Sequence, residues 1–213
     1  MQRYLVTGTD TDVGKTRLTA IVARTLLDAQ LRPTVVKLVQ TGAENGEPDD
    51  AERAGKLARC PYRTLERFAK PADPWSAALA QNRPPVRADA LARSLDGIEG
   101  TIVAEGAGGL AVPLNRDQHF GTVAQMAGLR IILAVGLRLG CMNHALLTLS
   151  LCDRLRLDVA GAVLVDRFAR SEQSYIDDVR RVLQGKIEIL GILPFEPNEA
   201  LAVAADTPLS TLF

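Results

Sequence analysis

The stretch Gly8–Thr16, GTDTDVGKT, combines glycines with a lysine and a hydroxyl residue in a way that suits phosphate binding. We interpret it as a phosphate loop of the type G-x-x-x-x-G-K-[ST], because the apolar residues Tyr4–Val6 precede it and a helical pattern follows. Glycines leave backbone N–H groups free to point at phosphate, and the helix N-terminus adds partial positive charge. Lys15 would then reach the β- and γ-phosphates of a nucleotide, and Thr16 would bind Mg²⁺. The alternative is a chance match in a glycine-rich turn, which the flanking elements disfavour.

Asp10 and Asp12 are unusual companions for a polyphosphate, because like charges repel. They fit the loop better if a cationic group, such as a metal ion or a substrate amine, binds beside it. The alternative is that they cap the turn or face water, and for Asp12 this explanation is at least as good.

Two carboxylates could orient the metal ion that a phosphate loop needs at the end of another strand. Glu105 in TIVAEGAGG ends an apolar run and precedes the glycine turn Gly106–Gly109, which leaves room for a phosphate or a substrate. Asp50, at the start of the helical pattern Asp50–Ala58, is the second candidate for the Mg²⁺ site. An acidic residue in the first helical turn also has a structural explanation, because it stabilises the helix dipole.

A second lysine, Lys37, lies near the end of the apolar run PTVVKLV. Burying its ammonium group there is costly unless negative charge pairs with it. Ligands of open α/β folds bind at this edge of the sheet, where the parallel strands end. We therefore expect Lys15 and Lys37 to converge on a transferring phosphoryl group, where fixed cations stabilise developing charge most.

Short apolar runs predict the strands that position these residues: RYLVTG, PTVVKLV, GTIVAEG, RIILAVG, VAGAVLV and EILGILP. Helical spacing appears between them, at Thr16–Gln30, Asp89–Leu95, Asn143–Leu155 and Ser171–Leu183. This alternation predicts a single α/β domain over residues 1–213, with a mostly parallel central sheet covered by helices on both faces, of the P-loop NTPase type. We interpret the polar stretch Ala43–Pro85 as a loop-rich crossover with one short helix, Asp50–Ala58.

The composition predicts a soluble, cytoplasmic protein. Of the 213 residues, 47% are hydrophobic, 25 are basic and 25 are acidic, so no net charge would attract nucleic acid or anionic lipid. Cys60, Cys141 and Cys152 form neither a CxxC pair nor a disulfide framework, as expected in a reducing cytosol. No apolar run reaches the length of a membrane span, and the first residues do not resemble a secretory signal. We expect no nucleic acid and no membrane among its partners.

The segments GTDTDVGKT, KLVQTG, EGAGG and VGLRLGCMNHALLT occur in an order and at a spacing that resemble the dethiobiotin synthetases. The likeness covers nearly the whole chain, from Tyr4 to about Asn198. It implies ATP-dependent ring-closing carboxylation of 7,8-diaminononanoate with CO₂ to dethiobiotin, ADP and phosphate, in biotin biosynthesis. A carbamate of one amine attacks the γ-phosphate, and the second amine closes the ring on the resulting carbamic-phosphoric anhydride. A diamine beside the phosphate loop would also explain Asp10 and Asp12.

The resemblance implies a role for each matching residue. Lys37 and Lys15 would be catalytic and hold the carbamate against the γ-phosphate. Mg²⁺ would be bound by Thr16, Asp50 and Glu105. Nucleotide contacts would come from Thr9, Asp10, Asp12, Val13, Gly14, Lys15, Thr16, Glu105, Gly106, Gly108, Asp166, Pro194, Phe195 and Glu199. Substrate contacts would come from Thr11, Lys37, Thr41, Gly108, Gly140, Cys141, Met142, Asn143 and Tyr175.

The carboxylate tail of the substrate would bind at the start of the helix Asn143–Leu155, whose free N–H groups suit an anion. In the resembling family this helix end and a tyrosine, matched by Tyr175, meet across a homodimer interface, so we expect a homodimer. From the residues alone, Asn143 could equally be an ordinary N-cap. We interpret His144 as a packing or capping residue and Cys141 as a small apolar residue, not as a base and a nucleophile.

Two positions depart from the family's pattern. Leu38 replaces the usual proline after the second lysine. The charge is kept, because Lys37 itself is present. Asp166, in VLVDR, replaces an asparagine that commonly reads adenine. A carboxylate only accepts hydrogen bonds, so Asp166 predicts a weaker preference for ATP over GTP or CTP, and other nucleotides could serve. Pro194, Phe195 and Glu199 in LPFEPNEA resemble the loop that closes over the base.

Two alternatives to a synthetase share the phosphate loop. Amide ligases of the cobyrinate type usually carry an added glutamine-hydrolysing domain, for which this chain has no room. Partition ATPases, which bind a partner instead of transforming a metabolite, typically have an extra lysine early in the loop, where Thr9–Val13 has none. Dependence of ATP hydrolysis on a diamine and bicarbonate, or on DNA, membrane or protein, separates these classes.

Overall fold

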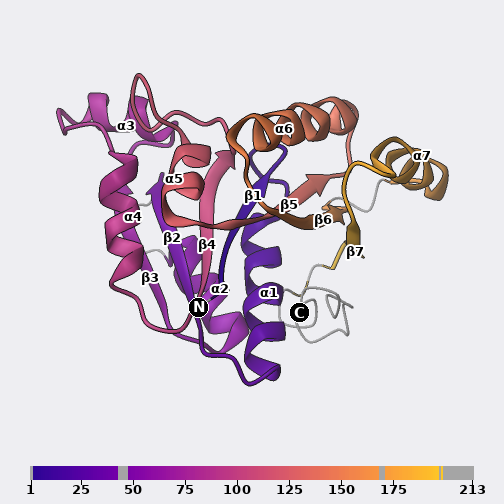
Figure 1. The fold of residues 1–213 in the computed structure, drawn as a ribbon, viewed down its shortest axis with the longest axis horizontal. Coiled ribbons are helices and arrows are strands. Elements are labelled where there is room, and N and C mark those ends of the chain that lie inside the picture. The colour runs from indigo at the N-terminus through magenta and orange to yellow at the C-terminus, as the bar shows by residue number, and fades with distance from the viewer. Residues whose placement is uncertain (1, 43–47, 168–170, 197, 199–213) are drawn as a thin grey trace.

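The computed structural model describes residues 2–42, 48–167, 171–196 and 198. Its core is a seven-stranded sheet in the order β3-β2-β4-β1-β5-β6-β7, in which neighbouring strands run parallel (Figure 1). The strands are β1 (Arg3–Gly8), β2 (Pro33–Thr41), β3 (Tyr62–Phe68), β4 (Thr101–Gly109), β5 (Arg130–Gly136), β6 (Val159–Val165) and β7 (Ile189–Leu193). The parallel sheet predicted from the apolar runs is confirmed, and each predicted run overlaps a strand.

The interpretation of Ala43–Pro85 as mostly loop is wrong, because this stretch contains strand β3 and the helix α3 (Pro74–Ala80). Strand β3 lies at the edge of the sheet and pairs with β2 alone. Its sequence, YRTLERF, is largely exposed or half-buried. An edge strand can be this polar because solvent reaches it, so it lacks the continuous apolar run of a central parallel strand.

Helices cover both faces of the sheet (Figure 1). They are α1 (Lys15–Asp28), α2 (Asp50–Ala58), α3 (Pro74–Ala80), α4 (Ala88–Asp96), α5 (Phe120–Ala127), α6 (Cys141–Leu155) and α7 (Gln173–Leu183). Along β1, Tyr4 and Val6 pack against the side covered by α1 and α2, while Leu5 packs on the opposite side with α4 and α5. Because successive strand residues point to opposite faces, a strand buried on both faces must be apolar throughout.

The predicted short helix Asp50–Ala58 is confirmed as α2, whereas α3 and α5 were not predicted. Among the described residues, none of the helices combines the length and the apolar character needed to cross a bilayer.

Strand order brings the candidate residues to one edge. In the register of β2 and β4, Lys37 lies directly beside Glu105, and on the other side of β4 Glu105 lies beside Val6 of β1. The phosphate loop leaves the end of β1 only a few residues later. The carboxyl ends of these strands therefore bring Lys37 and Glu105 close to the phosphate loop, which leads to Lys15 at the start of α1.

Candidate active site

The phosphate loop joins β1 to α1, as predicted, but its spacing differs from the interpretation of the sequence. Five residues separate Gly8 from Gly14, one more than the pattern G-x-x-x-x-G-K-[ST] contains. The loop includes two left-handed positions, Asp12 with φ 55° and Gly14 with φ 87°. A Cβ on Gly14 would lie 2.9 Å from a methyl group of Val165, so a side chain there would be both strained and crowded.

Asp10 has a structural role in the loop. Its Oδ1 accepts a hydrogen bond of 2.7 Å from the backbone N–H of Thr11, and its carboxylate pairs with Arg138. Capping of the turn, which the sequence left open as an alternative, therefore applies to Asp10. Asp12 is exposed and faces the cavity beside the loop.

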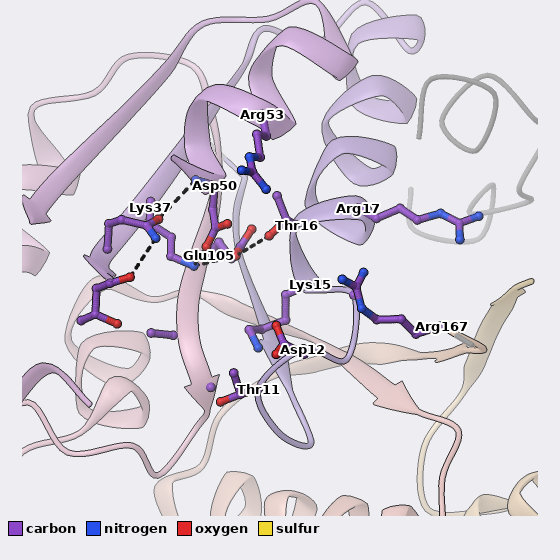
Figure 2. Close-up of a pocket in the computed structure, with 15 residues that line it drawn as sticks. Thr11, Asp12, Lys15, Thr16, Arg17, Lys37, Asp50, Arg53, Glu105 and Arg167 are labelled. Carbon is purple, nitrogen blue, oxygen red and sulfur yellow. Dashed lines mark hydrogen bonds and ion pairs between the residues drawn. The ribbon is translucent and has the colours of Figure 1, made fainter. Parts of the chain in front are cut away.

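That cavity, of about 300 Å³, lies between the phosphate loop and the ends of β2 and β4 (Figure 2). It is lined by Thr11, Asp12, Gly14, Lys15, Thr16, Arg17, Lys37, Gln40, Thr41, Asp50, Arg53, Glu105, Ala107, Gly108 and Arg167. Residues from the beginning, middle and end of the chain thus surround one space. Both lysines and all three candidate metal ligands lie in it, as the sequence predicted.

Lys37 is the centre of a buried charge network and is only 3% exposed. Its Nζ lies 2.5 Å from Asp50 Oδ2 and 2.7 Å from Glu105 Oε1, and it donates a third hydrogen bond of 3.0 Å to the carbonyl of Gly106. Burial by itself would lower the pKa of Lys37, but the carboxylates of Glu105 and Asp50 outweigh burial and raise it. Burial likewise opposes ionisation of Asp50, yet Lys37 lowers the pKa of that carboxyl group. The predicted need of Lys37 for negative charge is met by the two carboxylates predicted to bind Mg²⁺.

Lys15 lies across the same cavity and is also buried. Its Nζ donates a hydrogen bond of 2.9 Å to the backbone carbonyl of Asp10. Burial lowers the pKa of Lys15, Glu105 offsets part of this shift and the nearby ammonium of Lys37 adds to it, so that the pKa lies at about 8. In contrast to Lys37, Lys15 has no carboxylate within ion-pair distance among the described residues.

The oxygen atoms at the cavity fit a magnesium ion. Thr16 Oγ1 donates a hydrogen bond of 3.1 Å to Glu105 Oε1, and Glu105 Oε2 is buried without a hydrogen-bond partner in the described part of the chain. A buried carboxylate oxygen without a partner is costly unless a ligand supplies one. Within residues 2–42, 48–167, 171–196 and 198, no cluster of three His, Cys, Asp or Glu side chains could hold a metal by itself. Mg²⁺ typically binds to one or two carboxylates together with substrate phosphates and water, which matches this set.

Two loop residues predicted to bind nucleotide have side chains that serve packing. Thr9 Oγ1 accepts a hydrogen bond of 3.3 Å from the backbone N–H of Gly136 in β5. Val13 is buried, and a Cβ on Gly136 would lie 2.6 Å from its methyl group. Any contact of these two residues with a nucleotide would therefore use the backbone.

The residues at the start of α6 do not line the cavity within this chain. Helix α6 begins at Cys141 with Gly140 as its N-cap, so the N-cap explanation for Asn143 is wrong. Cys141 is buried, as expected of a small apolar residue, and its Sγ lies 3.4 Å from the hydroxyl of Tyr175. That hydroxyl donates a 2.7 Å hydrogen bond to the carbonyl of Arg138, and burial raises the pKa of Tyr175 to about 12. Gly140, Cys141, Met142, Asn143 and Tyr175 thus form a separate group.

The candidate base-binding residues lie beside the start of α1. Asp166 follows β6, and its Oδ2 accepts a hydrogen bond of 3.4 Å from the backbone N–H of Ser171. Arg17 Nη1 donates a 2.7 Å hydrogen bond to the carbonyl of Pro194, which ties the start of α1 to the segment after β7. Phe195 is exposed, and Glu199 lies outside the described residues.

Sequence reasoning missed five residues that line the cavity: Arg17, Gln40, Arg53, Ala107 and Arg167. Each stands close to a residue that was predicted, since Arg17 follows Thr16 and Arg167 follows Asp166. Arg53 lies one helical turn after Asp50, a spacing that puts both on one face of α2. This spacing was the signal that could have found it.

Asp49 holds the start of α2, and we expect its removal to destabilise the fold. Asp49 is buried, with 3% of its surface exposed. Its carboxylate accepts hydrogen bonds from Glu52 N at 2.8 Å and from Thr64 Oγ1 at 2.6 Å, and it pairs with Arg67. Asp49→Ala should lower the free energy of unfolding by about 2–4 kcal/mol, because a helix cap and a buried acceptor are lost together. Urea denaturation measures this change.

The matched control for Asp49 is Asp28→Ala at the exposed end of α1, where the carboxylate forms a surface ion pair with Arg24. The denaturation midpoint of that variant should stay close to that of the unmodified protein. Equal stability of Asp49→Ala and the unmodified protein would contradict the structural role of Asp49.

Comparisons with known proteins identify similar sequences and similar folds. A family model described as an AAA domain matches residues 2–200. The ATP-dependent dethiobiotin synthetase of Anaeromyxobacter dehalogenans is 35% identical over an alignment that covers 94% of this chain and 93% of that protein. The enzyme of the same name from Pseudescherichia vulneris is 33% identical, covering 93% of this chain and 87% of that protein.

Solved structures with the same fold have other names. The cell division ATPase MinD of Pyrococcus furiosus superposes with a TM-score of 0.60 at 17% identity, covering 98% of this chain and 90% of that one. A ParA family ATPase from Chlorobium tepidum superposes with a TM-score of 0.58 at 12% identity, covering 99% of this chain and 96% of that one. At these identities the likeness concerns the fold alone.

Proposed function

The chain belongs to the AAA domain family and, within it, to the ATP-dependent dethiobiotin synthetases, and we propose that its cavity closes the ureido ring of dethiobiotin. The proposed reaction uses 7,8-diaminononanoate, CO₂ and ATP with Mg²⁺. One observation carries the proposal: Lys15 at the start of α1 and Lys37 of β2 line one cavity with Asp50 and Glu105. The identities of 33–35% over most of both chains favour a synthetase over a partition ATPase, whose likeness is limited to the fold.

In the proposed reaction, this chain positions the carbamate and the γ-phosphate of ATP for in-line attack. A carbamate forms on one amine of the substrate with loss of a proton, and its oxygen attacks the γ-phosphorus while ADP leaves. Lys15 binds the terminal phosphoryl group, and Lys37 donates to that group and to the carbamate. The second amine then attacks the carbamate carbon and gives up a proton to solvent, phosphate leaves with the electrons of the broken C–O bond, and the ring closes. Holding the reactants in this geometry supplies much of the rate enhancement in phosphoryl transfer.

Lys37 must exchange partners for this reaction. In the structure its ammonium neutralises Asp50 and Glu105, whereas in the reaction it faces phosphate and carbamate oxygens. Thr16, Asp50 and Glu105 would then hold Mg²⁺, which when bound neutralises charge on the β- and γ-phosphates. Glu105 already accepts a hydrogen bond of 3.1 Å from Thr16 Oγ1, so these two candidate ligands lie next to each other.

The proposal also includes a binding place for the carboxylate tail of the substrate and a homodimeric state of the protein. The N-terminus of α6 has backbone N–H groups suited to the substrate carboxylate. Beside it, Leu139 is 95% exposed, and Leu146 and Leu147 are exposed on α6 itself. Apolar side chains on one helix end favour a second copy of the chain as their cover, which supports a homodimer with the tail at its interface.

A cytoplasmic location also belongs to the proposal. Cys60, Cys141 and Cys152 are free thiols, as expected in a reducing compartment. The proposed substrates are small polar metabolites, which reach an enzyme in the cytoplasm by diffusion.

Product analysis tests the proposed function. Purified protein is incubated with 7,8-diaminononanoate, bicarbonate and MgATP, and the product mass and the release of phosphate are measured. We expect a cyclic urea with the mass of dethiobiotin and phosphate release that requires the diamine. Absence of the cyclic urea would refute the proposal, and hydrolysis that requires DNA or a protein partner instead would favour a partition ATPase.

Base selectivity provides a separate prediction, which rests on Asp166. The preference for ATP over GTP and CTP in kcat/KM should be less than about a hundredfold, or roughly 2.7 kcal/mol, because the carboxylate cannot donate to adenine N7. Asp166→Asn should raise that preference about tenfold, since one base contact is worth on the order of 1–3 kcal/mol.

Asp158→Asn serves as the control for Asp166, because it removes a carboxylate from the other end of β6, where it pairs with Arg130. Its nucleotide preference should equal that of the unmodified protein. A preference for ATP above a hundredfold in the unmodified protein would defeat the prediction.

A further inference from the structure

The two lysines of the cavity do not by themselves give it the net positive charge that favours binding of a nucleotide. Three carboxylates, Asp12, Asp50 and Glu105, line it together with the two lysines. Lys37 is shared between Asp50 and Glu105, so the lysines and carboxylates together leave an excess of negative charge. Such a set would repel a polyphosphate unless further cations contribute. The excess positive charge of the cavity comes from arginines.

Three arginines line the cavity, and they lie on different sides of it (Figure 2). Arg17 donates to the carbonyl of Pro194, and its side chain extends away from Asp50 and Glu105. Arg167 lies on the side of the phosphate loop where Asp12 is found. Arg53 descends from α2 and lies beside Asp50 and Thr16, next to the candidate metal ligands.

The side chain of Arg53 is held in place yet has donors to spare. Its Nε donates a hydrogen bond of 3.2 Å to the carbonyl of Pro48, and its backbone N–H bonds to the carbonyl of Asp49 at 2.9 Å. No hydrogen bond or ion pair to a described residue engages its two terminal nitrogens. The buried carboxylate of Asp49 fixes the helix end from which Arg53 projects. A planar guanidinium that is oriented through Nε presents its remaining N–H groups as a fork suited to two phosphate oxygens.

We propose that Arg53 binds the β- and γ-phosphates of the nucleotide through its two terminal nitrogens, beside Thr16 and Asp50. This inference rests on the proposed ATP-dependent function, and it adds a polyphosphate contact from α2 to those of the phosphate loop. Because Asp50 and Arg53 share one face of α2, the same helix end supplies a metal ligand and a cation. Arg53 then offsets the negative charge that Asp50 and Glu105 bring to the cavity.

Nucleotide titration tests the role of Arg53. Isothermal titration calorimetry with Mg²⁺ and a non-hydrolysable ATP analogue is compared with titration of AMP, which lacks the β- and γ-phosphates. Arg53→Ala should weaken binding of the analogue about tenfold to a hundredfold, as expected for a charge-assisted bidentate contact, and leave AMP binding unchanged. Arg53→Lys should recover part of the loss, because a lysine keeps the charge without the fork.

Lys56→Ala is the matched control. Lys56 lies on the same helix, one turn after Arg53, pairs with Glu52 on the surface and does not line the cavity. Its removal takes the same charge from α2 and should leave analogue binding within twofold of the unmodified protein. Equal losses for Lys56→Ala and Arg53→Ala, an equal loss for AMP and the analogue, or complete recovery with Arg53→Lys would each overturn the proposal.

The same variants separate this inference from the proposed function. Binding of the ATP analogue decides the role of Arg53 whether or not the ring closes. Dethiobiotin formation by the unmodified protein decides the function, whatever Arg53→Ala does to binding. Thermal denaturation of each variant shows whether it is folded, as expected for replacement of an exposed side chain.

Discussion

Replacing Lys37 with glutamine should lower kcat for dethiobiotin formation about a hundredfold to a thousandfold, while the KM for ATP changes much less. The ammonium of Lys37 is expected to bind the phosphoryl group and the carbamate most strongly in the transition state, where charge spreads over their oxygens. An interaction made mainly in the transition state affects kcat and leaves ground-state binding largely intact. Lys15 and the loop backbone still bind the nucleotide in the variant.

Glutamine is preferred to alanine at this position because of the buried network around Lys37. Breaking a buried ion pair by removing one partner costs about 3–5 kcal/mol, since the other charge stays buried. Glutamine has a similar reach and can still donate to Glu105 and to the carbonyl of Gly106, both of which contact the lysine. Glu105, 1% exposed, then keeps a hydrogen-bond donor.

Steady-state kinetics with product detection measures the effect, and Lys186→Gln, which removes an exposed lysine after α7, serves as the control. Circular dichroism and thermal denaturation establish that the variant is folded. If folded Lys37→Gln or Lys37→Ala retained full kcat, the assigned role of Lys37 would be wrong.

Binding of ATP should weaken about tenfold between pH 7 and pH 9, because the ammonium of Lys15 has a pKa of about 8. Below this pH Lys15 is charged in the free protein and affinity is constant. As the pH rises through 8, the free protein loses the proton that the phosphates require, so each binding event must take one up. Bound phosphates raise the pKa of the ammonium, and affinity therefore falls as pH rises, with the proton uptake visible in calorimetry.

Lys15→Met should bind ATP more weakly at pH 7 and show no such decline up to pH 9. Lys37 does not contribute in this range, because its carboxylate partners raise its pKa above the ordinary value. The titrations are done without the diamine, in two buffers with different ionisation enthalpies so that proton uptake can be counted. Affinity independent of pH in the unmodified protein, or an unchanged decline in Lys15→Met, would contradict the role of Lys15.

The amino-acid sequence by itself determined the strands at the centre of the sheet, the phosphate loop and the candidate catalytic residues. Central parallel strands are buried on both faces, so runs such as RIILAVG and VAGAVLV were recognisable without any partner. Lys15 and Thr16 were recognisable from the phosphate-loop motif, and Lys37 and Glu105 because a charged residue at the end of an apolar run has few structural explanations. The bounds of α2 followed from the acidic first turn and the spacing of its alanines. These signals depend only on residues close in the sequence.

The tertiary structure alone decided which of these residues meet. Lys37 and Glu105 are neighbours because β2 and β4 pair in one register, although they are 68 positions apart in the sequence and β3 lies between them in chain order. The same order puts the polar strand β3 at the edge, where its sequence resembles a loop. Arg53 becomes a cavity residue because the cap at Asp49 sets the direction of α2. Local patterns specify an element and its buried face, but contacts between elements depend on strand order and register, which no local pattern contains.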